Sequence, residues 1–265
     1  MRARTIHTFS QLSINVHNLS LRFGRKEVLA GIDLAVETGG FYAIMGSNGC
    51  GKTTLLRCIG GLLEPSTGVV RLMDRDLKSY NARQLAQTVA IVRQHASTDM
   101  EFSAFEIVLM GRNPYQHRLE NESQNDWNIV EEAMQMTNTW HLRYSKPHEM
   151  SGGELQRVML ARALAQQTPI MLLDEPTSNL DIAHQYEIMS LLQEFNRTQK
   201  KTILIVVHDL NLAYRYCPEL ILLHDRKILY QGDMKEGLTP DRINTVFGVQ
   251  AAITEGNIVT RKVNG

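Results

Sequence analysis

A glycine-rich run between a strand-like and a helix-like segment constrains the fold of this chain most. Residues 46–54 fit the pattern of Gly, four residues, then Gly-Lys-Ser/Thr. Apolar residues 41–45 precede the run, and residues 55–59 have the character of a helix. The spacing predicts a strand, a phosphate-binding loop and a helix, in that order. The alternative, a chance glycine-rich turn, would leave this agreement between motif and setting unexplained.

Each residue type of the loop has a role in holding phosphate. Glycines let the backbone curl until successive N–H groups point at one anion, and the helix N-terminus adds its positive dipole end. Lys52 would place its positive charge beside the β- and γ-phosphates, and the Thr53 hydroxyl would bind Mg²⁺. We therefore expect a nucleoside triphosphate and Mg²⁺ as cofactors. The predicted nucleotide-binding residues of the loop, which the family resemblance described below assigns to ATP, are Gly46, Ser47, Asn48, Gly49, Cys50, Gly51, Lys52, Thr53 and Thr54.

Composition narrows the class of protein. The 265 residues include 28 Lys and Arg and 28 Asp and Glu, so the formal net charge is zero. Nucleic-acid binders usually carry a basic excess, so we expect no nucleic-acid partner. Three cysteines without metal-ligand spacing suit a reducing compartment. Because no apolar run approaches the roughly 18 residues that span a bilayer, we expect any work at a membrane to need a partner.

The order of apolar runs predicts an α/β fold. Residues 14–44 alternate apolar and polar positions between glycines, so we expect antiparallel strands there. Residues from about 100 to 167 carry apolar positions at helical spacing, which predicts a helical subdomain. Apolar runs at 170–173 and 202–207 flank a helix expected over 182–196, an alternation typical of a parallel sheet.

The sequence also predicts a hairpin in the C-terminal part of the chain and a division into domains. Residues 220–223 and 227–230 are expected to form a hairpin, and Asp181 to cap the helix that follows it. We expect residues 1–12 to be a flexible extension and 13–265 to form one domain, with 95–167 as an inserted helical subdomain.

Two acidic residues end the apolar run 170–173. In phosphate-loop ATPases an Asp at a strand end holds Mg²⁺, which predicts that role for Asp174. The adjacent Glu175 could accept a proton from an attacking water. The alternative is a strand that simply meets solvent at its polar end, and the upstream phosphate-binding loop argues against it.

A second glycine motif precedes a strongly helical segment. Ser151, Gly152, Gly153 and Glu154 begin a helix expected over 154–165, and a Ser with two glycines there makes a further anion cradle. The alternative is an ordinary helix start capped by Ser151. One nucleotide does not need two cradles on one chain, so the second would face the nucleotide of another molecule.

Taken together, these motifs resemble those of the ATP-binding subunit of ABC (ATP-binding cassette) transporters, in the family's order. The resemblance spans about residues 14–235. In order, the matching motifs are the adenine-stacking aromatic, the phosphate-binding loop, the Q-loop glutamine, the signature, the Walker B end, the D-loop and the switch histidine. They correspond to Phe23, Gly46 to Thr54, Gln94, Ser151 to Gln156, Asp174-Glu175, Ser178 to Asp181 and His208. It implies a P-loop NTPase core with a mainly parallel sheet, an N-terminal antiparallel β subdomain and an inserted α-helical subdomain.

The resemblance also implies catalytic roles. Glu175 would be the general base, His208 would hold the γ-phosphate and water, and Gln94 would sense Mg²⁺ and water. Lys52 would serve the phosphates, and Thr53, Gln94 and Asp174 would serve the metal. We therefore expect a competent ATPase.

Two copies would pack head to tail, because the resemblance implies an ATP between the loop of one subunit and the signature residues 151–154 of the other. Asp181 ends the segment 178–181, which resembles the D-loop of the family. The implied partners are a second copy, integral membrane permease subunits and, indirectly, an extracytoplasmic substrate-binding protein. The implied location is the cytoplasmic face of the cell membrane.

Three hypotheses about the system remain open. Residues 105–115 and 208–213 resemble segments of importers for ferric siderophores, haem and cobalamin, which favours a metal-chelate or related metal or oxyanion importer. The alternatives are an ATPase subunit of another ABC transporter, whether exporter or importer, and a soluble ABC ATPase outside transport. The chain shows neither the second cassette nor the long coiled-coil insertion usual in the last class.

Overall fold

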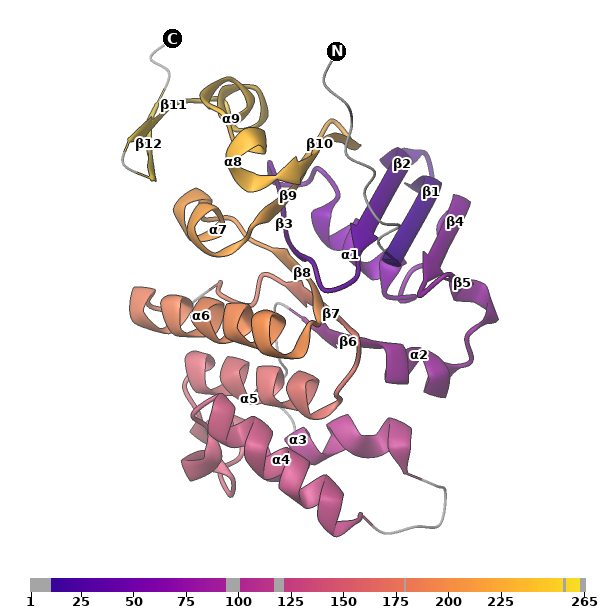
Figure 1. Cartoon of the computed structure of the whole chain (residues 1–265), viewed down its shortest axis with the longest axis vertical. Helices are drawn as coiled ribbons and strands as arrows, with labels where there is room; N and C mark the ends of the chain where they lie inside the picture. The colour runs from indigo at the N-terminus through magenta and orange to yellow at the C-terminus, as the bar shows by residue number, and fades with distance from the viewer. Residues whose placement is uncertain (1–10, 94–100, 117–121, 179, 255, 263–265) are drawn as a thin grey trace.

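A six-stranded sheet forms the centre of the structure, a computed structural model that describes residues 11–93, 101–116, 122–178, 180–254 and 256–262. The strands are β3 (Phe41–Gly46), β6 (Val89–Val92), β7 (Ile170–Asp174), β8 (Thr202–Val206), β9 (Glu219–His224) and β10 (Lys227–Asp233). Their order is β10-β9-β3-β8-β7-β6, and every pair is parallel except β9 with β10. The carboxyl ends of β3, β7 and β8 therefore meet at one edge (Figure 1).

A second, antiparallel sheet lies beside the first (Figure 1). It comprises β1 (Leu12–Phe23), β2 (Lys26–Glu37), β4 (Thr67–Leu72) and β5 (Arg75–Asp76), in the order β2-β1-β4-β5. The expectation of antiparallel strands over 14–44 is confirmed for β1 and β2 and wrong for the last segment, because β3 pairs in parallel with β8 and β9. All six residues of β3 are buried, as a central strand covered on both faces requires. β1 already begins at Leu12, within the expected extension.

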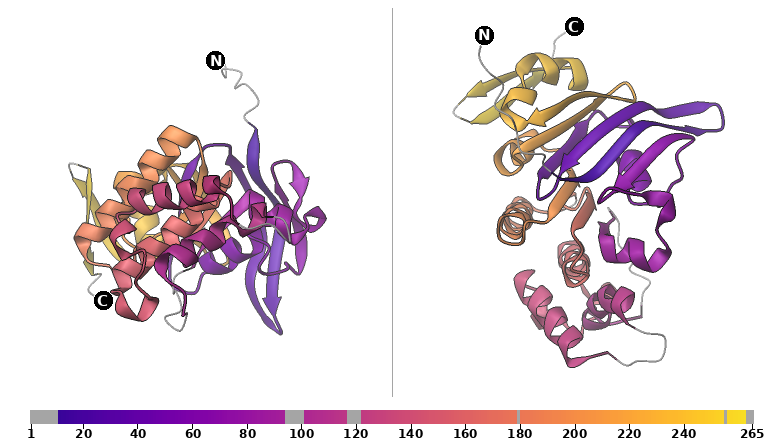
Figure 2. Two further views of the ribbon diagram at one scale, coloured as in Figure 1. Left: turned by 90° about the horizontal axis from the view of Figure 1, so that it is seen from below. Right: turned by 45° about the vertical axis from the view of Figure 1, so that its right-hand side comes forward.

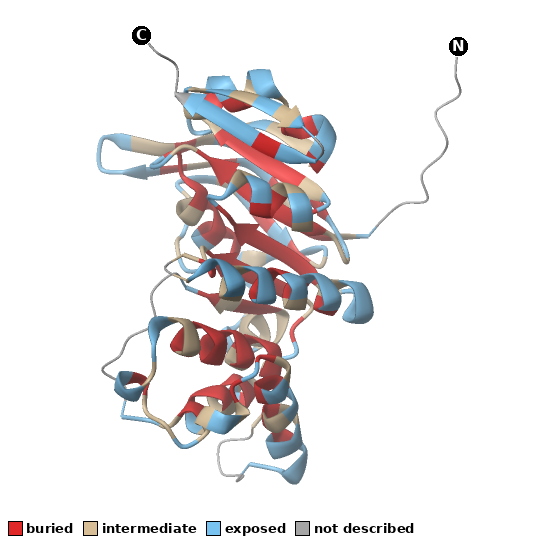
Figure 3. Cartoon of the chain, turned by 90° about the vertical axis from the view of Figure 1, so that its left-hand side faces the viewer, coloured by how far each residue is buried: buried red, intermediate tan, exposed pale blue. Residues whose placement is uncertain are grey.

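Alternation along β3 divides the interior into two cores. Ala43 and Met45 face one side, where they join the buried residues of the longer helices. Tyr42 and Ile44 face the other side, toward the antiparallel sheet and the first helix. Successive side chains of a strand point to opposite faces, so one strand serves both cores. The buried residues concentrate along these strands and the inward faces of the helices (Figure 3).

The helices cover the central sheet and extend beyond it (Figures 1 and 2). They are α1 (Lys52–Ile59), α2 (Ala82–Thr88), α3 (Ala104–Leu109), α4 (Gln124–Met136), α5 (Gly152–Ala165), α6 (Ile182–Gln199), α7 (Leu210–Tyr216), α8 (Met234–Gly237) and α9 (Pro240–Phe247). A hairpin of β11 (Val249–Thr254) and β12 (Asn257–Lys262) follows. In Figure 1, α3 and α4 lie together below α5, at the far end from the β11–β12 hairpin.

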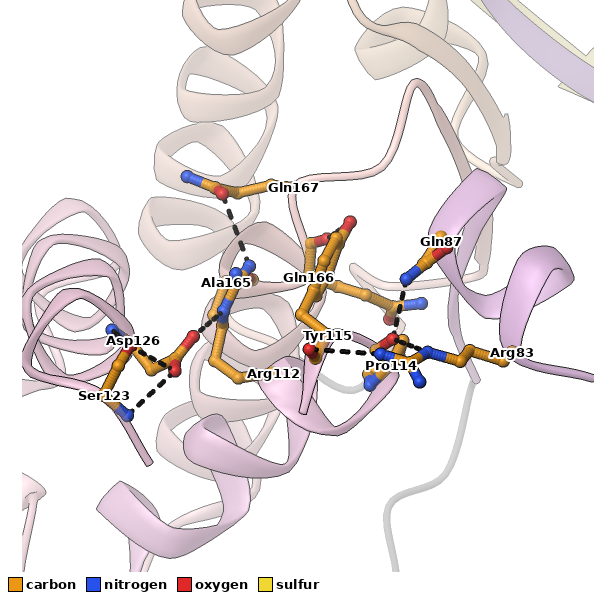
Figure 4. A network of polar contacts seen from close by, with 10 residues as sticks. All are labelled: Arg83, Gln87, Arg112, Pro114, Tyr115, Ser123, Asp126, Ala165, Gln166 and Gln167. Carbon is orange, nitrogen blue, oxygen red and sulfur yellow. Dashed lines mark hydrogen bonds and ion pairs between the residues drawn. The ribbon is translucent and has the colours of Figure 1, made fainter. Parts of the chain in front are cut away.

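A buried ion pair holds these lower helices together (Figure 4). Arg112, in the 3₁₀ helix Met110–Tyr115, donates from Nε to Asp126 Oδ1 of α4 at 2.8 Å. Its Nη1 donates to the carbonyl oxygen of Ala165, the last residue of α5, at 2.8 Å. One guanidinium therefore connects three helical segments.

Candidate active site

The phosphate-binding loop fits tightly against its neighbours, as its glycines require. Gly46 has a φ of 152°, and a Cβ there would collide with the carbonyl oxygen of Leu223 in β9. Gly51 has a φ of 109°, and a Cβ there would lie 2.7 Å from Cδ2 of Leu29. Only glycine allows this approach of the backbone to β9 and β2. The loop then leads directly into α1, as predicted.

Lys52 lies inside the curl of the loop. The residue is only 5% exposed, and its Nζ donates to the carbonyl oxygens of Gly46 at 2.9 Å and Ser47 at 3.0 Å. These bonds hold the ammonium group within the loop. A bound phosphate would gain a point charge already in place.

Thr53 and Asp174 meet although they belong to distant segments. Thr53 Oγ1 donates to Oδ1 of Asp174, the last residue of β7, at 2.8 Å. Asp174 is 4% exposed, and this burial, together with the neighbouring charge of Glu175, raises the pKa of its carboxyl group. A buried carboxylate of this kind favours a cation beside it. Hydroxyl and carboxylate oxygens are ligands that Mg²⁺ accepts.

Glu175 and His208 form the second pair at this edge. β7 and β8 are parallel neighbours in which Asp174 lies opposite Val206, so the residues that follow the two strands lie side by side. Glu175 Oε1 and His208 Nε2 are 2.5 Å apart. Glu175 has a positive φ of 51°, and Ser178 fixes its backbone by donating from Oγ to the Glu175 carbonyl oxygen at 2.8 Å. The structure thus places His208 beside Glu175.

The signature residues present a separate, open helix start. Ser151 caps the 14-residue helix α5 in a reciprocal capping box with Glu154, whose carboxylate accepts from the Ser151 N–H and Oγ, both at 2.8 Å. These bonds lower the pKa of Glu154. Ser151 and Gly152 are exposed, and a Cβ on Gly152 would meet only open space. Packing within the described part of the chain therefore does not require a glycine at this position.

The structure also describes Phe23, Asp181 and Cys50, three further residues predicted for the site. Phe23 ends β1 and is 54% exposed as a residue, so its side chain is accessible for stacking. Asp181 caps α6, as predicted, by accepting from the N–H of His184 at 2.9 Å. Cys50 is buried, which raises the pKa of its thiol and makes it a poor nucleophile. Gln94 lies outside the described residues.

A cavity of about 480 Å³ adjoins the phosphate-binding loop. Its walls include residues that the sequence analysis did not single out, among them Arg25, Lys26 and Val28 of the β1–β2 hairpin and Arg226 of the β9–β10 turn. The hairpin 220–230 was expected, and yet its position beside the loop depends on the parallel pairing of β9 with β3. No local pattern in the sequence reveals that pairing.

Comparisons with known proteins give a matching family, related sequences and related structures. The ABC transporter family profile matches residues 29–178. The ferric enterobactin transport ATP-binding protein of Escherichia coli strain K12 is 38% identical over 248 residues, which cover 94% of this chain and 92% of that protein. Within the described residues, no helix is both long and apolar enough to span a bilayer.

Two solved structures share the fold. One belongs to a proposed metal-chelate type ABC transporter in an inward-facing conformation, with a TM-score of 0.80, 27% identity, and coverage of 94% of this chain and 96% of that one. The other is a dimeric ATP-binding cassette in a post-hydrolysis state with ADP and Pi, with a TM-score of 0.73, 28% identity, and coverage of 83% and 98%. The motifs, their geometry and these similarities lead to one conclusion: the chain belongs to the ABC transporter family and is an ATPase.

Proposed function

We propose that this chain is the ATP-hydrolysing subunit of a membrane importer for a metal chelate such as a siderophore, haem or cobalamin. The related ferric enterobactin protein and the metal-chelate type structure support this cargo class. The segments 105–115 and 208–213, which resemble that importer group, support it as well.

The observation that carries the ATPase mechanism is the convergence of Lys52, the Thr53–Asp174 pair and the Glu175–His208 pair at one edge of the sheet. In the proposed reaction a water oxygen bonds to the γ-phosphorus, the bond to the bridging oxygen breaks, and the water proton passes to Glu175. An ionised carboxylate can only accept hydrogen bonds, so His208 Nε2 carries the hydrogen in this pair. His208 thereby holds the Glu175 carboxylate in one orientation, and with nucleotide bound it would turn to hold the γ-phosphate and the attacking water.

Thr53 and Asp174 fit a Mg²⁺ ion that accompanies the nucleotide. No cluster of three or more His, Cys, Asp or Glu able to hold a metal occurs among the described residues. Mg²⁺ commonly takes one or two protein oxygens and completes its shell with substrate phosphates and water. The Thr53 hydroxyl and the buried Asp174 carboxylate provide such oxygens, and we assign Gln94 to the same role. When bound, the ion would neutralise charge that develops on the phosphates.

The assembly we propose is a head-to-tail homodimer. The exposed Ser151 and Gly152 would donate to the γ-phosphate held by the partner's loop, so hydrolysis would remove the joint between the subunits. Residues 95–167 would act as a helical subdomain that receives the permease. The proposed location is the cytoplasmic face of the membrane, with an extracytoplasmic binding protein as an indirect partner and no nucleic acid.

Purification from native membranes in mild detergent tests the transport assignment. We expect a polytopic permease of the importer type to co-purify in stoichiometric amount. We also expect uptake of a ferric or cobalt chelate into vesicles that contain this complex to stop with Lys52→Ala, since that variant loses the charge inside the loop. Co-purification with ribosomal or DNA-repair proteins and no permease would contradict the proposal.

A further inference from the structure

The turn between β9 and β10 has an unusual residue in its second position. Asp225 and Arg226 form a two-residue loop in which both residues have positive φ, 44° and 68°. Hairpin turns of this kind strongly prefer Asp-Gly or Asn-Gly, because glycine adopts this conformation without strain. A long side chain there costs stability, and such positions cluster at functional sites.

The backbone fixes this turn against the phosphate-binding loop. The N–H of Ala30 in β2 donates to the Arg226 carbonyl oxygen at 3.0 Å, and Leu223 of β9 pairs with Gly46 at the start of the loop. Arg226 lines the cavity of about 480 Å³ whose other walls include residues 47–50 of the loop. Ligand cavities commonly have volumes of roughly 300–1,000 Å³, so this one is large enough for much of a nucleotide.

The walls of this cavity carry an excess of positive charge. Arg25, Lys26 and Arg226 are cationic, and Glu27 and Asp225 are the two acidic residues of the lining. The Glu27 carboxylate already pairs with Arg22 at 2.9 Å. The cavity therefore favours an anion next to the loop.

We propose that Arg226 binds the phosphate chain of the nucleotide from the side of the β9–β10 turn. This inference rests on the proposed ATP site and adds an affinity-determining residue to it. A guanidinium presents several N–H donors in a fixed plane and suits phosphate oxygens better than a smaller residue would. The strain of the turn is then the cost of carrying that side chain to the cavity.

Arg226→Gly separates the two effects of this residue. We expect the dissociation constant of this variant for a fluorescent ATP analogue to be roughly tenfold higher than that of the wild-type chain, because a charged hydrogen-bond donor is lost. The dependence of this dissociation constant on salt concentration should also weaken. In the same variant, the melting temperature without nucleotide should rise by roughly 2–4 °C, because glycine relieves the turn.

Lys200→Gly is the matched control. Lys200 is also an exposed cation with a positive φ, 54°, and it lies beyond the end of α6 rather than at the cavity. We expect a similar gain in melting temperature and unchanged nucleotide affinity. Arg226→Lys should retain part of the affinity, because it keeps the charge.

Three results would overturn the inference or its basis. Unchanged affinity in Arg226→Gly, with affinity lost in Lys52→Ala, would refute the role of Arg226 and leave the ATP site intact. Unchanged affinity in both variants would refute the ATP site itself. A loss for the ATP analogue and none for the matching GTP analogue would show recognition of the base and contradict the assignment to the phosphates.

Discussion

Asp174 and Glu175 are neighbours in the chain, and their carboxylates have different surroundings. Asp174 ends β7 with its side chain buried against the Thr53 hydroxyl, where burial raises its pKa. Glu175 follows with a positive φ and pairs with His208. The two carboxylates thus have different partners, which fits the proposed metal role of Asp174 and the proposed proton transfer to Glu175.

Asp174→Asn should stabilise the nucleotide-free protein at neutral pH. Because the folded pKa of Asp174 is raised, the native state binds the proton more tightly than the unfolded chain does. The stability due to this group is therefore present below its unfolded pKa of about 3.9 and is lost as pH rises through the folded pKa. We expect the variant to melt a few degrees higher at about pH 8, with a smaller gain at about pH 5.

Thermal unfolding in EDTA across that pH range measures the effect. Binding of Mg²⁺ with ATP should be lost in the same variant, so stability and function would move in opposite directions. A gain in melting temperature that does not change with pH would show that the carboxylate charge is not its cause.

At the scale of elements, the N-terminus of α5 combines a structural cap with an exposed surface. The capping box between Ser151 and Glu154 satisfies the N–H groups of these two residues, and Gly152 between them faces open space. The two alternatives considered from the sequence, a cap and an anion cradle, are thus compatible. The cap itself is confirmed, and the contact with a nucleotide remains a proposal.

Two substitutions of Ser151 separate these roles. Ser151→Ala should lower the free energy of unfolding by about 1 kcal/mol, because the cap is lost. Ser151→Asp keeps an acceptor for the Glu154 N–H and loses the donor to the Glu154 carboxylate, so it should retain only part of the cap. It should also prevent ATP-dependent dimers, because its charge would oppose the γ-phosphate. Chemical denaturation and light scattering would measure the two effects. ATP-dependent dimers of Ser151→Asp would contradict the proposed contact.

Substitutions at the Arg112–Asp126 ion pair measure how much this pair stabilises the packing of α4 against its neighbours (Figure 4). Asp126→Ala should lower the free energy of unfolding by roughly 3–5 kcal/mol, because Arg112 would stay buried without its partner. Ser123→Ala is the control. Ser123 Oγ donates to Asp126 Oδ2 at 2.6 Å within the cap of α4, so its removal should cost only about 1 kcal/mol. Equal costs in urea denaturation would show that the cap, and not the ion pair, dominates.

At the scale of the whole molecule, one sheet with two cores brings distant motifs to one edge. Much of this could be predicted from the sequence, because continuous apolar runs marked β7 and β8 and the motifs stood at strand ends. The sequence analysis wrongly expected β3 to pair in antiparallel fashion. Its parallel pairing with β8 and β9 involves segments far away in the chain, so the six residues of β3 alone do not reveal it. The role of Arg112 and the approach of Arg226 to the loop depend on tertiary packing in the same way.

The central claim is that Glu175 drives hydrolysis of an ATP that joins two copies of this chain. The most direct test is to measure ATP turnover and oligomeric state for Glu175→Gln. We expect ATP binding to persist, turnover to fall by roughly a hundredfold or more, since a general base contributes about 10²–10⁴-fold, and a stable ATP-bound dimer to accumulate. Turnover at the wild-type rate, or a variant that binds ATP and stays monomeric, would contradict the account.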